Sequence, residues 1–285
     1  MNYSATTVLL PEYSMEETAE LLGRLGFDGA EWRVRRIPDK QRGAPYSPWG
    51  NVKNDLPPER LAAEAERLRR VSRDNGLAIA GIASNALCTD LDDVKRLAEG
   101  CAACGAPFFR LMAPSGYSRT RPYPQLLEEA VDAFGKALEI VRPYKVKVAV
   151  EIHMGTLTVS ASQAYLLVRH FPPEEIGVIY DFNNMTKEGF ETWRMGMELL
   201  GPYLLHVHIG NHAPRPGEVL PDGTQKWVWE GVPLEKGLTD IAQGLSDLKA
   251  VGYTGFISLE DFRAAPAEEK LRDGLRYLKA VEARI

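Results

Sequence analysis

Eight short apolar segments alternate with eight longer amphipathic segments along the chain, and this alternation limits the fold more than any other feature. The short segments are rich in β-branched and aromatic residues, which is typical of strands. They cover 6–10, 30–34, 77–82, 108–112, 146–152, 177–180, 204–209 and 256–259. The longer segments have the helical period and cover 15–25, 58–75, 91–104, 124–141, 161–171, 190–200, 234–250 and 267–283. Such alternation predicts βα units around a parallel sheet.

The number of units favours a closed barrel over an open sheet. Eight βα units in 285 residues match the (β/α)8 TIM barrel, which takes about 250 residues as one domain. The rival is a doubly wound open sheet, but no G-x-G-x-x-G or G-x-x-x-x-G-K-[ST] loop follows a strand. We therefore predict the α/β class and a single TIM-barrel domain over 1–285. The loops at 35–57 and 210–233 are long enough to bind substrate or to cover a site.

Charge and cysteine content narrow the class of partner. The formal net charge of -5 argues against a broad affinity for nucleic acid or anionic membranes. Three cysteines are too few for a secreted disulfide framework, and the N-terminal stretch has no signal-peptide pattern. We expect a cytoplasmic protein that acts on a small molecule, with no nucleic acid and no membrane as partner.

The last four predicted strands end in side chains that commonly bind metals. In chain order these are Glu151 and His153, Asp181, His206 and His208, and Glu260. Residues two apart on a strand share a face, and the carboxyl ends of barrel strands meet at one mouth. Three carboxylates crowded there would repel one another unless a cation neutralised them. A mainly oxygen donor set suits Mg²⁺ or Mn²⁺ better than zinc or copper.

The phrases around these residues carry a family resemblance. EIH, YDFNN, LLHVHIGN and FISLED resemble the xylose isomerase-like TIM-barrel superfamily of sugar isomerases and epimerases. The resemblance follows the strand order over nearly the whole chain, and its specific motifs lie in the second half. It implies that Glu151, Asp181, His208 and Glu260 hold one divalent ion, for which we expect Mn²⁺, with Mg²⁺ or Co²⁺ as alternatives. It also implies that the two glutamates form the acid/base pair.

Two positions depart from the ketose 3-epimerase pattern within that superfamily. Asn184 stands where many relatives have a histidine, and Leu157 stands where the 3-epimerases have a substrate-binding glutamate. Both changes weaken the 3-epimerase assignment. His153 points to the same mouth and is a candidate general base.

Several further residues are candidates for binding substrate. His206 and His208 share a face, so the residues alone leave open which of them is the metal ligand; His208 fits the family pattern. The predicted substrate-binding set is His206, Asn184, Asn211, Arg215, Arg110 and Trp32. Glu31 is expected to pair with Arg33 or Arg110, because a barrel-facing arginine needs a partner. Tryptophans in the long loops are candidates to stack on a sugar or aglycone ring: Trp49, Trp227 and Trp229.

The site as predicted favours chemistry at a carbon next to a carbonyl. A divalent ion chelated by a hydroxyketone lowers the pKa of the α-proton and stabilises the resulting metal-bound enediolate. The leading hypothesis is a metal-dependent isomerase or epimerase of a ketose or cyclitol. The alternative is a carbon–oxygen or carbon–carbon lyase on an oxidised sugar, either inosose dehydratase-like or the catalytic subunit of a 3-oxo-C-glycoside deglycosidase.

Two other classes are less favoured by the sequence. A metal-dependent endonuclease of the same superfamily would need additional histidine ligands, and no histidine lies in the first half of the chain. A sugar-binding barrel without catalysis would lack a cation. The resemblance further implies a homo-oligomer, with a second small subunit in the deglycosidase case.

Overall fold

Eight parallel strands close into a barrel in the computed structural model, which describes residues 1–285. Their order around the barrel is β1-β10-β7-β6-β5-β4-β3-β2. The strands are β1 (Asn2–Thr6), β2 (Gly29–Val34), β3 (Ala78–Ser84), β4 (Phe108–Arg110), β5 (Lys147–Glu151), β6 (Ile176–Asp181), β7 (Leu204–Ile209) and β10 (Phe256–Leu259). The predicted (β/α)8 barrel is thereby confirmed.

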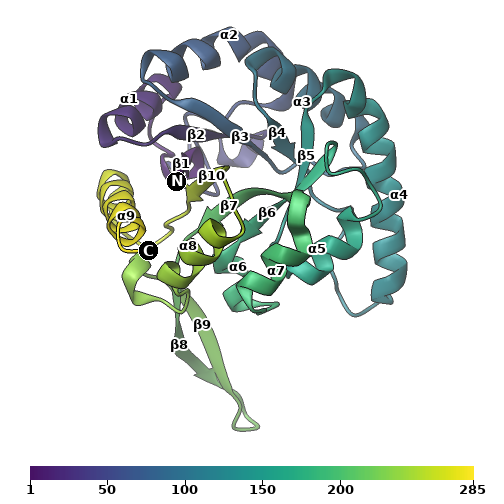
Figure 1. The fold of residues 1–285 in the computed structure, drawn as a ribbon, viewed down its shortest axis with the longest axis vertical. Helices are drawn as coiled ribbons and strands as arrows, with labels where there is room; N and C mark the ends of the chain where they lie inside the picture. The colour runs from purple at the N-terminus through teal and green to yellow at the C-terminus, as the bar shows by residue number, and fades with distance from the viewer.

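Helices surround the strands, as Figure 1 shows. They are α1 (Met15–Leu25), α2 (Pro58–Asp74), α3 (Leu91–Cys104), α4 (Tyr123–Val141), α5 (Ala161–Val168), α6 (Phe182–Lys187), α7 (Trp193–Leu200), α8 (Ile241–Ala250) and α9 (Ala267–Glu282). The start of α1 is fixed by a capping box between Ser14 and Glu17, and its end by Gly26 at φ 86°. The apolar stripes of the helices pack on the sheet in one core of 65 buried residues. None of the helices has the length and apolar character needed to cross a membrane.

The first strand lies earlier than predicted. We expected it over 6–10, but β1 covers Asn2–Thr6, and Thr7–Leu9 form a 3-10 helix. Ser4 and Thr6 are buried polar residues, so the true strand has little apolar signal. The apolar run that follows it is buried, and the Thr7 hydroxyl accepts a hydrogen bond from the Arg33 backbone N–H at 3.0 Å.

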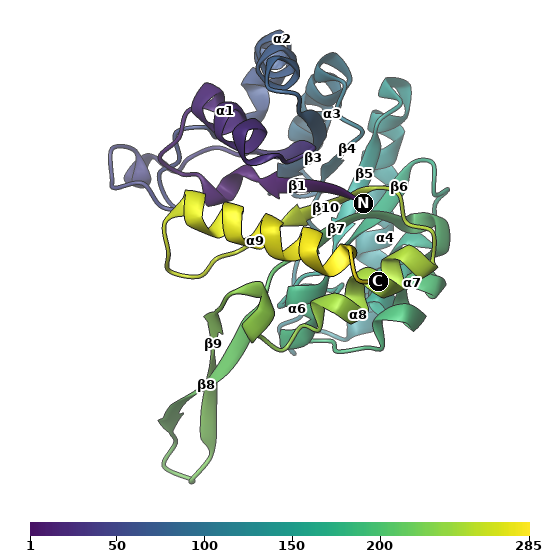
Figure 2. The ribbon, with the colours of Figure 1, turned by 60° about the vertical axis from the view of Figure 1, so that its left-hand side comes forward.

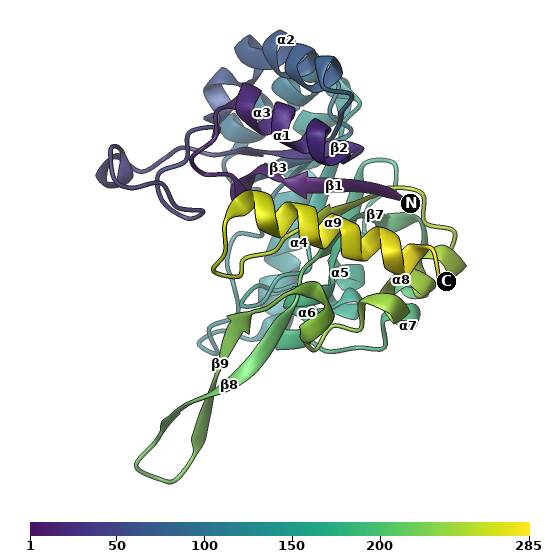
Figure 3. The ribbon, with the colours of Figure 1, turned by 90° about the vertical axis from the view of Figure 1, so that its left-hand side faces the viewer.

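The segment after β7 also differs from the prediction. The expected loop at 210–233 is an antiparallel hairpin of β8 (His212–Val219) and β9 (Gln225–Gly231). Figures 2 and 3 show this hairpin projecting away from the barrel. The helix expected over 234–250 is divided into a 3-10 turn at Leu234–Lys236 and α8, which Asp240 caps by accepting the Gln243 N–H.

Large side chains close the inside of the barrel below its mouth. Phe108, Ala149 and Ile179 form a separate buried cluster with Leu205 packed against it. A Cβ atom on Gly81 would lie 2.2 Å from the Phe108 ring, so glycine is required opposite this phenylalanine. The barrel is therefore a packed core with an open end, and it has no channel through it.

Candidate metal centre

Four predicted ligands meet at the carboxyl ends of neighbouring strands. Glu151 ends β5, Asp181 ends β6, His208 lies near the end of β7, and Glu260 follows β10. One ligand atom from each lies within 4.8 Å of all the others. His208 Nδ1 is 3.1 Å from Glu151 Oε1, 3.6 Å from Glu260 Oε2 and 3.9 Å from Asp181 Oδ2. The structure brings together the whole set that the resemblance implied.

Electrostatics in this cluster favour a bound cation. Burial, and after it the charges of Asp181 and Glu151, raise the pKa of Glu260 to about 8, against the opposing effect of His208. Burial likewise raises the pKa of Asp181. Without a cation, these carboxyl groups tend to keep protons because several negative charges would share a buried space. A divalent ion would relieve this repulsion, and the carboxylate and imidazole donors fit such an ion.

Arg110 pairs with Glu151 and not with Glu260, and the pKa values of the two glutamates shift in opposite directions. The Arg110 guanidinium donates to the Glu151 carboxylate and, through Nε, to the Ser84 carbonyl at 2.7 Å. Burial would raise the pKa of Glu151, but Arg110 and then His208 outweigh it and lower the pKa to about 2. Glu151 is therefore held ionised, whereas Glu260 has no arginine partner and keeps 14% of its side chain exposed.

His208 and His206 have different surroundings although both point into the barrel. His208 turns Nδ1 toward the carboxylate cluster. His206 lies deeper, with its ring 5.1 Å from that of Phe108, and its Nε2 has no hydrogen-bond partner. Its nearest acid is Glu31, whose Oε2 is 3.4 Å from Nε2. His206 is therefore outside the group of four.

The expected pairing of Glu31 with an arginine is wrong. Glu31 is fully buried and contacts His206 and His208. Arg33 instead donates from Nε to Asp55 at 2.8 Å, and Arg35 does the same at 2.6 Å. The Asp55 side chain has no exposed surface. These two ion pairs connect the 35–57 loop to β2. The arginines therefore pair with an acid of the loop, and Glu31 contacts only the two histidines.

His153 faces a cavity beside the cluster. This cavity has a volume of about 230 Å³ and is lined by Arg110, Glu151 and His153 together with apolar side chains that include Leu87 and Met112. His153 Nδ1 lies 2.7 Å from the Met154 carbonyl oxygen. Because a carbonyl only accepts, Nδ1 carries the proton of the neutral ring and Nε2 keeps a lone pair. This arrangement suits a base.

The two predicted substrate-binding asparagines are engaged within the protein. Asn184 donates its backbone N–H to Asp181 Oδ1 at 2.8 Å and its side-chain amide to Oδ2. It therefore orients a candidate ligand. Asn211 donates to two backbone carbonyls, those of Leu234 and Thr239, and its oxygen accepts two backbone N–H groups. With its hydrogen-bonding groups used, Asn211 holds the segment before α8, and the structure does not support its role in binding substrate.

Trp32 and Arg215 do not reach the cluster. Trp32 alternates with Glu31 along β2, so its buried side chain faces the surrounding helices. Arg215 lies on the exposed hairpin and pairs with Glu230 at 2.5 Å. Trp227 and Trp229 are also exposed on this hairpin. The Trp49 ring lies 5.1 Å from the ring of Phe262, which follows Glu260 by two residues in the sequence.

Lys187 is a functional candidate that the sequence analysis missed. It is half-buried at the end of α6, the short helix that begins after Asp181. Burial lowers the pKa of its ammonium, while Asp181 and Glu260 oppose this effect. The lysine thus lies in the electrostatic field of two candidate ligands. The sequence analysis did not predict α6, and this helix is what places Lys187 near the two acids.

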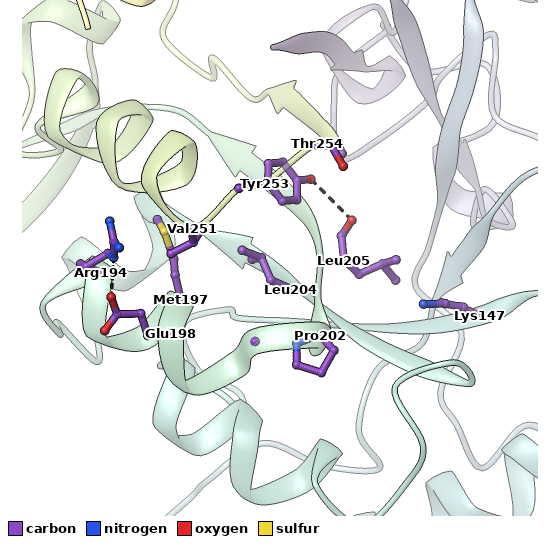
Figure 4. Close-up of a pocket in the computed structure, with 13 residues that line it drawn as sticks. Lys147, Arg194, Met197, Glu198, Pro202, Leu204, Leu205, Val251, Tyr253 and Thr254 are labelled. Carbon is purple, nitrogen blue, oxygen red and sulfur yellow. Dashed lines mark hydrogen bonds and ion pairs between the residues drawn. The ribbon is translucent and has the colours of Figure 1, made fainter.

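A larger cavity lies at the other end of the barrel. It measures about 560 Å³ and includes Lys147 and Leu204, which begin β5 and β7 (Figure 4). Arg194 and Glu198 at its edge pair with each other at 2.6 Å. Since the candidate ligands lie at the opposite ends of these strands, this cavity is separate from the site.

The model of one protein family, described as xylose isomerase-like TIM barrel, matches residues 19–281. Among curated proteins, an inosose isomerase of Bacillus licheniformis is 26% identical over 194 residues. The match covers 64% of this chain and 65% of that relative, so the chain spans slightly less than two thirds of its length.

Among solved structures, two examples share the fold over 98% or more of this chain. A probable 3-DHS dehydratase from Bacillus anthracis aligns with a TM-score of 0.74 and 19% identity, covering 98% of this chain and 99% of that one. The IOLI protein, solved with a zinc atom, aligns with a TM-score of 0.73 and 19% identity, covering 100% and 99%.

Proposed function

Because the chain belongs to the xylose isomerase-like TIM-barrel family, we propose that it is a divalent-cation-dependent isomerase or epimerase of a ketose or cyclitol. The proposed reaction begins with removal of the proton next to the carbonyl. The observation that carries the proposal is the meeting of Glu151, Asp181, His208 and Glu260 at the barrel mouth. We propose Mn²⁺ as the cation, with Mg²⁺ or Co²⁺ as alternatives.

The four clustered residues would hold this cation. When bound, it would supply a positive charge that lowers the pKa of the α-proton of a hydroxyketone. Arg110 keeps Glu151 ionised through their ion pair, and Asn184 orients Asp181 through two hydrogen bonds. Both contacts fix ligands before the substrate arrives, which reduces the reorganisation that the reaction requires.

Proton transfer is assigned to the two glutamates and His153. Glu151 and Glu260 come from strands separated by two others around the barrel, so they approach a substrate from different sides. One removes the proton, and return of a proton on the other face gives epimerisation. Return at the neighbouring carbon gives isomerisation. His153 lines the cavity beside Glu151 and, with Nδ1 held by the Met154 carbonyl, would act as the base there through Nε2.

A lyase is the second candidate, favoured by the same cavity. Its volume of about 230 Å³ and the side chains of Leu87 and Met112 provide space for a group attached to the sugar beyond the reacting carbons. Loss of such a group after proton removal is a β-elimination. The substrate would be an oxidised sugar or an inosose, as for an inosose dehydratase or a 3-oxo-C-glycoside deglycosidase.

Isotope exchange tests the shared first step. The protein is incubated with Mn²⁺ and a panel of ketohexoses and inososes in D₂O, and deuterium at the α-carbon is measured by NMR. Exchange that disappears with a chelator and in Glu151→Gln is the expected result. An absence of exchange over the whole panel would refute proton abstraction. Mass analysis of products separates isomers from elimination products, which have lost water or an aglycone.

A further inference from the structure

We infer that Glu31 is a positioning residue of the cation site, acting through His208. It holds the imidazole so that Nε2 carries the proton and Nδ1 is free to bind the cation. The inference rests on the proposed cation site, but Glu31 itself lies outside the group of four candidate ligands.

The distances place the His208 ring between two sets of acids. Nε2 is 3.1 Å from Glu31 Oε1 and 3.0 Å from Oε2, both within hydrogen-bonding distance. On the other side of the ring, Nδ1 is 3.1 Å from Glu151 Oε1. The imidazole therefore bridges Glu31 to the cluster.

The hydrogen-bonding capacity of these groups decides which nitrogen holds the proton. An ionised carboxylate can only accept, and a neutral imidazole has one N–H. With the proton on Nδ1, the lone pair of Nε2 would face both oxygens of Glu31 in a fully buried position. With the proton on Nε2, Glu31 accepts it, and a cation shared with Glu151 would take the Nδ1 lone pair, which otherwise faces Glu151 Oε1 at 3.1 Å. Histidine ligands of metals commonly donate their other N–H to a carboxylate in this way.

The surroundings of Glu31 leave it no other partner. It has no exposed surface, and its ion-pair contacts are with His206 and His208 alone. A buried carboxylate needs a positive charge or a hydrogen-bond donor beside it, and the His208 ring supplies one to Glu31. A cation on Nδ1 would polarise the His208 ring and strengthen its Nε2–H donor toward Glu31. The His208 ring is therefore the group on which the buried carboxylate of Glu31 depends.

His206 supports this arrangement from below. Its Nε2 approaches Glu31 Oε2 at 3.4 Å, and its ring is 5.4 Å from that of His208 at an angle of 87°. Phe108 packs against the other side of His206. Glu31 is therefore confined from two directions, and its carboxylate has little freedom to turn away from His208.

The test is Glu31→Gln in the full chain, with Mn²⁺ affinity measured by calorimetry. Glutamine has the same shape, but its amide can donate to Nε2 and so shift the His208 proton to Nδ1. We expect the affinity to fall by about ten- to a hundredfold while circular dichroism stays unchanged. Glu31→Asp retains the charge and should recover part of the loss. Asp247→Asn is the matched control, because this buried carboxylate on α8 contacts Gln243 and no histidine.

A spectroscopic readout separates positioning from general damage. Long-range ¹H–¹⁵N correlations of the Mg²⁺- or Zn²⁺-loaded protein report which nitrogen of His208 carries the proton. A proton on Nε2 in the wild type, and a proton on Nδ1 with loss of His208 from the cation in Glu31→Gln, supports the inference. An unchanged Mn²⁺ affinity in Glu31→Gln, with normal binding by the wild type, would overturn it and leave the proposed function intact. Cation binding without turnover would reject the proposed reaction alone, whereas a wild type that binds no divalent cation would reject both.

Discussion

Replacing Glu260 by glutamine should stabilise the cation-free protein while removing its cation-dependent activity. Burial and the charges of Asp181 and Glu151 raise the pKa of Glu260 from 4.5 to about 8. Between these two values the folded protein holds a proton that the unfolded chain releases. The free energy of unfolding therefore falls as the pH rises through this range. Glutamine is neutral at every pH, so the free energy of unfolding of the variant lacks this fall.

The pKa difference sets the size of the gain. At about pH 7.5 the folded carboxyl group keeps its proton some three pH units above its ordinary pKa, which costs at most about 4 kcal/mol. Glu260 titrates together with the neighbouring carboxyl groups, which share this cost, so we expect a gain of about 2–4 kcal/mol. Near pH 5 the same reasoning gives less than about 1 kcal/mol, because the unfolded chain is itself partly protonated there.

Urea unfolding of both proteins in a chelator, at these two pH values, measures the effect. Saturating Mn²⁺ should reverse the order of stability, because only the wild type keeps all four proposed ligands. Activity in the D₂O assay should be lost. A variant less stable than the wild type at about pH 7.5 in chelator, or a gain of equal size at both pH values, would refute the electrostatic reasoning.

Three further outcomes are expected. The pKa values of Glu260 and His208 are raised, so a binding cation must displace protons from both. Calorimetry should therefore show the affinity for Mn²⁺ rising from about pH 6 to pH 8, by up to about tenfold per pH unit for each proton released. An affinity that does not change with pH would contradict this. Gly100→Ala should lower the free energy of unfolding, measured by urea unfolding, by about 1–3 kcal/mol, because the new Cβ on α3 would lie 2.4 Å from Leu61 Cγ on α2. If the variant were as stable as the wild type, the two helices would have to move apart at little energetic cost. Asp55→Asn should cost about 3–5 kcal/mol in the same assay, because two arginines lose a buried charged partner; a loss below about 1 kcal/mol would mean that the loop is not held by these pairs.

The barrel and the meeting of the four candidate ligands could be predicted because both depend on local pattern. Glu151, Asp181 and Glu260 each stand at or just after the end of an apolar run, and barrel closure brings such positions together. β1 was placed too late, since its inward residues Ser4 and Thr6 are polar and give no apolar signal. The hairpin of β8 and β9 was missed because both strands are largely exposed and β8 contains two prolines.

The partner of Glu31 could not be predicted from its neighbours in the sequence. Glu31 and His208 are 177 positions apart, and their strands are not adjacent in the sheet. Their contact depends on the register of the whole barrel, including irregularities between Ala30 and Glu31 and between Val178 and Ile179. A sequence pattern gives the face on which a side chain lies, but not which residue it meets across a closed barrel.

The packed floor of Phe108, Ala149, Ile179 and Leu205 has a consequence for the order of events. With the barrel closed below His206, cation, substrate, product and solvent share one entrance. In the proposed site a substrate would lie between the cation and this entrance, so the cation would enter before the substrate and leave only after the product. Bound substrate should therefore slow cation exchange, and chelators should inactivate the resting protein faster than the protein during turnover.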